Sequence, residues 1–95
     1  MSRAYVVGNV TIRDVEKWAQ YVAAIPATIT PWGGELMLRG RQAFLLTGQP
    51  QHRDLVVLSF PDLASINGWY ESPAYQALVP LRDAAATVDL AAYEA

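Results

Sequence analysis

The apolar pattern at the start of the chain changes from a strand type to a helix type at Arg13-Asp14. Residues 3–12 are rich in Val and Tyr, which favour strands. Asp14 is a residue type that caps helix N-termini, and beyond it apolar side chains recur every three or four positions, at Val15, Trp18, Val22, Ile25 and Ile29. The pattern predicts a strand over 3–12 and then a helix, which Pro26 kinks or restarts and a Pro-Gly turn over 31–34 ends.

The middle of the chain holds two short apolar runs and one longer one. Residues 35–39 and 43–47 are separated by Gly40, which indicates either a bulge within one long strand or a turn between two strands. Residues 48–53 combine Gly, Pro and polar side chains, a composition typical of a loop. The Leu-Val-Val-Leu run within 54–60 predicts another strand.

The second half of the chain predicts a broken helix and a last strand. Pro61-Asp62 begins a helical segment, and one face of this segment holds Leu63, Ile66, Trp69 and Tyr70. Ser72-Pro73 supplies a new N-cap and a first-turn proline, so a second helical piece is expected over 74–83. Residues 87–94 are short and moderately apolar and predict the last strand.

The order of these elements predicts the fold class. Strand, helix, strand, strand, helix, strand is the split βαβ arrangement, an α+β fold in which an antiparallel sheet carries both helices on one face. Ninety-five residues give one hydrophobic core and leave no room for a second. We therefore expect a single domain over 1–95.

Both faces of the predicted strands are apolar, although a sheet with helices on one face and water on the other alternates apolar with polar residues. Within 54–60, Val56, Leu58 and Phe60 point one way while Leu55 and Val57 point the other. An uncovered face of this kind exceeds the few hundred Å² of apolar surface that a soluble monomer normally exposes. We expect a homodimer in which a second copy covers the far face; the alternative is that loops of the same chain cover it.

Composition narrows the classes of function. Apolar residues make up 53% of the chain and charged residues 17%, which excludes a disordered protein. The net charge of −2 and the lack of a basic stripe disfavour nucleic acid as a partner. With no Cys and one His, disulfides, thiolate chemistry and multi-histidine metal sites are excluded. The apolar run 4–7 is far shorter than a signal or membrane segment, so we expect a cytoplasmic protein with no membrane partner.

Several segments together resemble a bacterial family called domain of unknown function 1330. The matching residues are Tyr21 to Pro26, Trp32-Gly33-Gly34, Arg39-Gly40, Val56 to Pro61, Trp69 to Gln76 and Arg82. The Trp-Tyr-x-Ser-Pro-x-Tyr-Gln segment over 69–76 is the most specific of these. The resemblance implies a ferredoxin-like fold, a βαββαβ antiparallel sheet with two helices on one face, and the assembly of the dimeric α+β barrel group. It implies no activity, because the family as a whole has no established one.

Two positions depart from the pattern that the resemblance implies. The family commonly carries an acidic residue just before the Phe of its third strand, whereas this chain has Ser59, which removes an acid/base group from that position. Asn67-Gly68 stands where helix formers are expected, and it should loosen the helix there.

The resemblance also implies a ligand cavity between the sheet and the helices. The side chains that could reach it are Asn9, Tyr21, Trp69 and Tyr70, with Arg39 or Arg53 holding an acidic group by a bidentate contact. Tyr75 is a further hydrogen-bond donor of the same kind. Each residue also has a purely structural interpretation. The Asn9 amide could bond to a water or a neighbouring side chain, and the aromatic residues could pack in the core. The arginines could form salt bridges with Glu35, Asp54 or Asp62.

The sequence offers no residue in a suitable position to ligate a haem iron. The haem-degrading oxygenases of the same barrel group combine an Asn, a Trp and a His, but His52, the sole His, lies in the loop and reads as a solvated residue. No Ser/His/Asp set, phosphate-binding loop or carboxylate pair is evident either, so no cofactor and no metal are expected.

Three functions remain. The first is a homodimer that binds a small apolar or aromatic acid, the second a cofactor-independent oxygenase or isomerase, and the third a structural dimer without a ligand. The loss of the acidic residue at Ser59 weakens the second.

Overall fold

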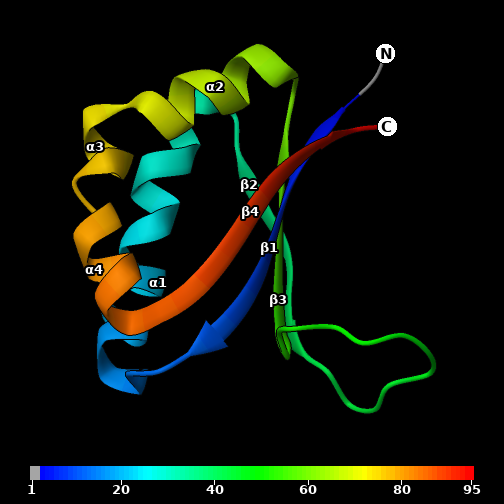
Figure 1. The fold of residues 1–95 in the computed structure, drawn as a ribbon. Coiled ribbons are helices and arrows are strands. Elements are labelled where there is room, and N and C mark those ends of the chain that lie inside the picture. Colours follow the sequence, from blue (N-terminus) through cyan, green and yellow to red (C-terminus); the bar gives the residue numbers. More distant parts are fainter. Residues whose placement is uncertain (1–2) are drawn as a thin grey trace.

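The computed structural model describes residues 3–95 and forms one antiparallel four-stranded sheet with helices on one of its faces (Figure 1). In chain order the elements are β1 (Ala4–Ile12), α1 (Val15–Ile29), the 3-10 turn η1 (Thr30–Trp32), β2 (Glu35–Arg41), β3 (Asp54–Phe60), α2 (Leu63–Glu71), α3 (Pro73–Gln76), α4 (Val79–Ala85) and β4 (Ala86–Glu94). The sheet order is β2-β3-β1-β4, so β1 and β3 are central. This is the predicted ferredoxin-like fold.

The first helix begins where the sequence indicates. The Asp14 side chain accepts a hydrogen bond from the backbone N–H of Lys17 at 3.1 Å, which caps α1. The helix continues through Pro26 as one element to Ile29, so the predicted restart at Pro26 does not occur. Gly33 then takes a positive φ of 72°, a conformation that glycine adopts without steric cost, and ends η1.

The second helical region is divided into three pieces. Asp62 caps α2, and the Ser72 hydroxyl accepts from the backbone N–H of Tyr75 at 3.2 Å, which confirms the new N-cap before Pro73. The helix predicted over 74–83 is instead split between α3 and α4.

Gly68 does not loosen α2, contrary to the expectation. The helix is continuous from Leu63 to Glu71, and the indole of Trp32 lies against the glycine. A Cβ at position 68 would lie 2.3 Å from Cζ3 of Trp32. Glycine is therefore required by a close approach between η1 and α2.

Around Gly40 the structure agrees with neither of the two alternatives in full. β2 runs through Gly40 without a turn, and its irregularity lies between Leu36 and Leu38, where Met37 is the additional residue. Residues 43–47, the second apolar run, form no strand. They belong to residues 42–53, a long loop that we call the arm and that extends from the sheet on the side away from the helices (Figure 1).

The core lies between the helices and one face of the sheet, which we call the covered face. Along β1, the buried residues Ala4, Val6 and Val10 alternate with more exposed ones, so the covered face takes every second residue. Trp69 and Tyr75 are the largest side chains packed on it. Among residues 3–95, no helix is long and apolar enough to cross a bilayer.

The opposite face, here called the open face, has no helix of residues 3–95 above it (Figure 1). Strand pairing places Val7 beside Val57, and Val57 beside Leu38, so that apolar side chains adjoin across three strands. The other end of the same face is polar, where Asn9 pairs with Asp89 of β4. The arm adds exposed apolar side chains on this side of the molecule, with Phe44 74% and Leu46 88% exposed.

Candidate functional site

A small apolar cavity separates α1 from the covered face, where the resemblance implied a ligand site. Its volume is about 50 Å³, and a single charged side chain, Arg39, contributes to its wall; the aromatic residues are Trp18, Tyr21 and Trp69. Gly8 lies beside Val56, one of the lining residues, and glycine is needed there because a Cβ would lie 2.7 Å from Cγ1 of Val56.

A wider hollow adjoins this cavity toward the end of the sheet where β1 stops. It measures about 290 Å³ and shares Trp18, Arg39 and Val56 with the cavity. We call the two together the cleft. The outer hollow alone approaches the roughly 300 Å³ at which small-molecule pockets begin, whereas the inner cavity has room for a short apolar group.

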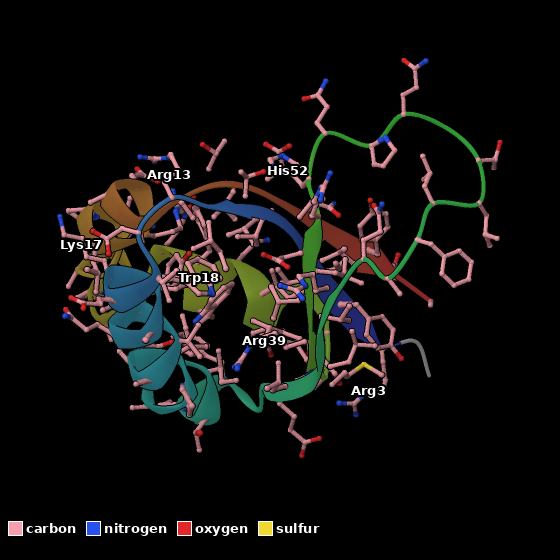
Figure 2. The ribbon with its side chains drawn as sticks, turned by 90° about the horizontal axis from the view of Figure 1, so that it is seen from below. Arg3, Arg13, Lys17, Trp18, Arg39 and His52 are labelled. Carbon is pink, nitrogen blue, oxygen red and sulfur yellow. The ribbon has the colours of Figure 1, made fainter. Side chains whose placement is uncertain are left out.

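Arg39 stands at the junction of these two spaces. It pairs with Val56 in the register of β2 and β3, which directs its side chain to the covered face. Figure 2 shows Trp18 and Arg39 between the helix layer and the sheet. Within residues 3–95, Arg39 has no ion pair and no side-chain hydrogen bond, so the salt bridges considered from the sequence do not form, whereas Arg82 pairs with Asp83. A guanidinium in this position can bind a carboxylate.

Trp69 lies at the floor of the cleft, but its polar atom is already used. The indole Nε1–H donates to Oγ1 of Thr28 at 3.1 Å, and both residues are buried. The ring packs on Tyr75 with a centroid distance of 4.4 Å. Trp69 therefore contributes shape and apolar surface to the cleft, and its expected hydrogen bond to a ligand is replaced by one to α1.

Behind this floor, three side chains form a chain of hydrogen bonds from the surface to the cleft. Nη1 of Arg82 donates to the hydroxyl of Tyr75 at 3.0 Å, and that hydroxyl lies 2.9 Å from the hydroxyl of Tyr21. Tyr75 is 0% exposed and Tyr21 7%. Burial, followed by the proximity of Tyr75, raises the pKa of Tyr21 well above its usual value, so Tyr21 stays protonated.

The guanidinium of Arg82 also stays charged. Burial by itself lowers the pKa of Arg82, but its hydrogen bond to the hydroxyl of Tyr75, together with the nearby hydroxyl of Tyr70, outweighs this effect and raises it. A fixed positive charge therefore lies at the outer end of the chain of hydroxyls. The sequence named Tyr21 and Tyr75 as separate donors; their pairing across 54 residues is a tertiary contact that spacing does not reveal.

Of the six residues predicted to bind a ligand, three line the inner cavity together: Tyr21, Arg39 and Trp69. Tyr70 lies on the other side of Trp69, in a hollow between α2 and β4. Asn9 and Arg53 do not line this cavity. Asn9 lies on the open face beside His52, and Arg53 lies at the base of the arm.

His52 is not a solvated loop residue, contrary to the expectation. Its Nδ1 lies 2.8 Å from Oγ1 of Thr11, and its Nε2 lies 2.8 Å from Oδ2 of Asp89. Figure 2 places it where the arm meets the sheet. The trio resembles a nucleophile, base and carboxylate, but the Asp89 side chain is 71% exposed, unlike the buried carboxylate of a hydrolase triad. We interpret it as the anchor of the arm.

Ser59 also belongs to the open face rather than to the cleft. Nε of Arg3 donates to its hydroxyl at 3.1 Å, and Ser59 pairs with Tyr5 in the sheet. An acidic residue at this position would meet Arg3 and not a ligand in the cleft. Ser59 is therefore no argument against the oxygenase hypothesis.

Within residues 3–95, no cluster of three or more His, Cys, Asp or Glu side chains could hold a metal ion.

Comparisons with known proteins agree with this architecture. The model of a family described as "Domain of unknown function (DUF1330)" matches residues 3–95, as the sequence motifs indicated. No curated protein matches the sequence.

Several solved structures are similar to the whole chain, among them the following three. The protein of unknown function RPA0582 from Rhodopseudomonas palustris has a TM-score of 0.82 and 18% identity, over 97% of this chain and 81% of that one. A dimeric ferredoxin-like protein of unknown function from Jannaschia sp. CCS1 has a TM-score of 0.79 and 11% identity, over 98% and 99%. SnoaB, a cofactor-independent oxygenase from Streptomyces nogalater, has a TM-score of 0.70 and 12% identity, over 100% and 94%. At these identities the likeness shows the ferredoxin-like fold.

Proposed function

The chain belongs to the DUF1330 family, and we propose that it is a homodimeric domain that binds a small apolar or aromatic acid in the cleft. The observation that carries this proposal is Arg39, a guanidinium without an ion pair in residues 3–95 beside a cavity otherwise lined by apolar and aromatic groups. The carboxylate of the ligand lies at Arg39 in the outer hollow. Its apolar end enters the inner cavity, where burial of carbon favours binding.

The second copy covers the open face in this proposal. The apolar row through Val7, Val57 and Leu38 crosses three strands, and no helix or strand of residues 3–95 lies over it (Figure 1). Two neighbours in fold are described as dimeric ferredoxin-like proteins, which supports the same assembly here. A two-fold contact of this face with itself is self-complementary, and the arm of each copy would extend over the other.

The test of binding compares two arginines. Titration of the 15N-labelled protein with 4-methylpentanoate should shift amide signals of β2 and α1 in a saturable way. The Arg39→Gln variant should bind at least tenfold more weakly, because a charge-assisted hydrogen bond contributes about 1.5–3 kcal/mol. Arg53→Gln is the matched control, since Arg53 lies at the base of the arm, and it should bind as the parent does. Equal weakening in both variants would contradict the site.

A second candidate is a cofactor-independent oxygenase or isomerase. It is supported by the similar fold of SnoaB and by the apolar lining of the inner cavity, which would keep water from a reactive intermediate. Oxygen uptake measured across a panel of hydroquinones distinguishes the oxygenase from binding alone. Turnover above the rate without protein would support it, and a rate at background for every compound would leave the binding function. If the protein neither binds acids nor consumes oxygen, the isomerase and the structural dimer remain.

A further inference from the structure

The order of donors in the Arg82, Tyr75 and Tyr21 chain can be decided by counting hydrogens. A guanidinium only donates, so the Tyr75 oxygen accepts the bond from Arg82. The hydroxyls of Tyr75 and Tyr21 share one further contact at 2.9 Å, in which either can be the donor. Each hydroxyl owns one hydrogen, so one of the two hydrogens is left without a partner in this contact.

Burial selects between the two arrangements. If Tyr21 donates, the hydrogen of Tyr75 has no acceptor among the hydrogen bonds of residues 3–95, and Tyr75 is 0% exposed. If Tyr75 donates, both of its contacts are used, and the hydrogen left over belongs to Tyr21, which lines the cleft. An unpaired polar hydrogen costs more in the core than at the wall of a cavity, where a ligand or water can accept it. The second arrangement is therefore favoured.

The positive charge of Arg82 acts in the same direction. By donating to Tyr75, it withdraws electron density from that oxygen and strengthens its hydrogen as a donor toward Tyr21. The same polarisation passes to the hydrogen of Tyr21. Because the pKa of Tyr21 is raised, this hydroxyl keeps its hydrogen and offers a donor rather than a base.

We propose that the Tyr21 hydroxyl donates a hydrogen bond into the cleft and that the ligand is an oxo acid, with its carboxylate at Arg39 and its carbonyl oxygen at Tyr21. This inference rests on the proposed function and specifies its ligand class. A carbonyl matches the site because it accepts without donating, and Tyr21 and Arg39, which both line the inner cavity, offer only donors to it.

The first experiment needs no ligand. In protein labelled with 13C at Cζ of tyrosine, a slowly exchanging hydroxyl in mixed H2O and D2O gives two Cζ signals, and a rapidly exchanging one gives a single averaged signal. Tyr75 should give two signals and Tyr21 one, with each assigned from its Phe variant. Slow exchange at Tyr21 together with fast exchange at Tyr75 would overturn the donor order.

The second experiment compares 4-methyl-2-oxopentanoate with 4-methylpentanoate, which differ in the carbonyl group. The parent should bind the oxo acid roughly three- to tenfold more tightly, the range of one hydrogen bond. Tyr21→Phe should abolish this preference, and Arg39→Gln should weaken both ligands while keeping their ratio. Equal binding of both acids by the parent overturns the ligand class and leaves the proposed function intact. Binding of neither acid overturns both, and the exchange experiment still decides the donor order.

Discussion

The covered and open faces belong to the same four strands, yet they are completed in different ways. On the covered face, the helices of the same chain bury Trp69 and Tyr75 and provide hydrogen-bond partners for their polar atoms. On the open face, apolar side chains such as Val57 and Leu38 adjoin polar ones, and no helix or strand of residues 3–95 lies above them (Figure 1). Apolar residues on a strand therefore indicate that a face is to be buried, but they do not indicate whether a helix of the same chain or a second copy covers it.

The largest effect is expected from a cavity in the covered face. Trp69→Ala should lower the free energy of unfolding by about 3–5 kcal/mol, because a fully buried indole is removed and its neighbours cannot close the space. Urea unfolding should give this loss at every protein concentration, since the contact lies within one chain. Trp32→Ala removes a partly exposed indole and serves as the control. An equal loss in both variants would contradict the central place of Trp69.

A charge on the open face should act on assembly instead. Val57→Asp places a carboxylate in the apolar row, and we expect it to weaken the proposed dimer by about 3 kcal/mol or more, over a hundredfold, because the charge would be buried in the apolar contact. Sedimentation equilibrium measures the change. Ala64→Asp adds the same charge to an exposed position of α2 and should leave the dimer unchanged. A Val57→Asp protein that still dimerises like the parent would show that another surface holds the two copies.

Alkaline pH should affect the covered face through Tyr21. In the unfolded chain this phenol ionises near pH 10, whereas in the folded chain its pKa is raised by burial. The contribution of Tyr21 to the free energy of unfolding is therefore fully present below pH 10. Above pH 10 it falls by about 1.4 kcal/mol per pH unit. Tyr21→Phe should reduce this slope in urea unfolding at alkaline pH. Parallel slopes for the parent and the variant would contradict the raised pKa.

The smallest effect is expected at the anchor of the arm. His52→Ala removes both hydrogen bonds, to Thr11 and to Asp89, and should cost about 1 kcal/mol or less, because these bonds are largely exposed to water. Amide hydrogen exchange of residues 42–53 should become faster while the helices keep their protection. Gln51→Ala alters the neighbouring exposed side chain and is the control. Unchanged exchange in the arm of the His52 variant would contradict the anchor.

The fold was largely predictable, because strands and helix caps leave local signals. Asp14 and Ser72 cap helices as their residue types indicate, and the strand over 54–60 has the predicted bounds. The arm was not predictable from its apolar run, because a strand also needs a neighbour to pair with, and 43–47 finds none within this chain.

The candidate site was predictable in part. Tyr21, Arg39 and Trp69 line the inner cavity together, whereas Asn9 lies on the open face of β1. Successive strand residues alternate between faces, and both sets in β1 contain apolar residues, so the sequence did not show which set meets the helices. The partners of Trp69 and Tyr75 depend on contacts between distant segments and have no signal in local spacing.

The position of β1 in the sheet has a consequence during synthesis. The ribosome makes β1 before either of its neighbours, and its pairing with β4 joins Ala4 to Glu94. The nascent chain must therefore keep an apolar strand unpaired until β3 and then β4 have emerged. Pairing between such distant segments is slow, and an exposed strand edge is prone to aggregation in the meantime. We expect the sheet to close only after translation of β4, and a chaperone that holds β1 to increase the yield of folded protein.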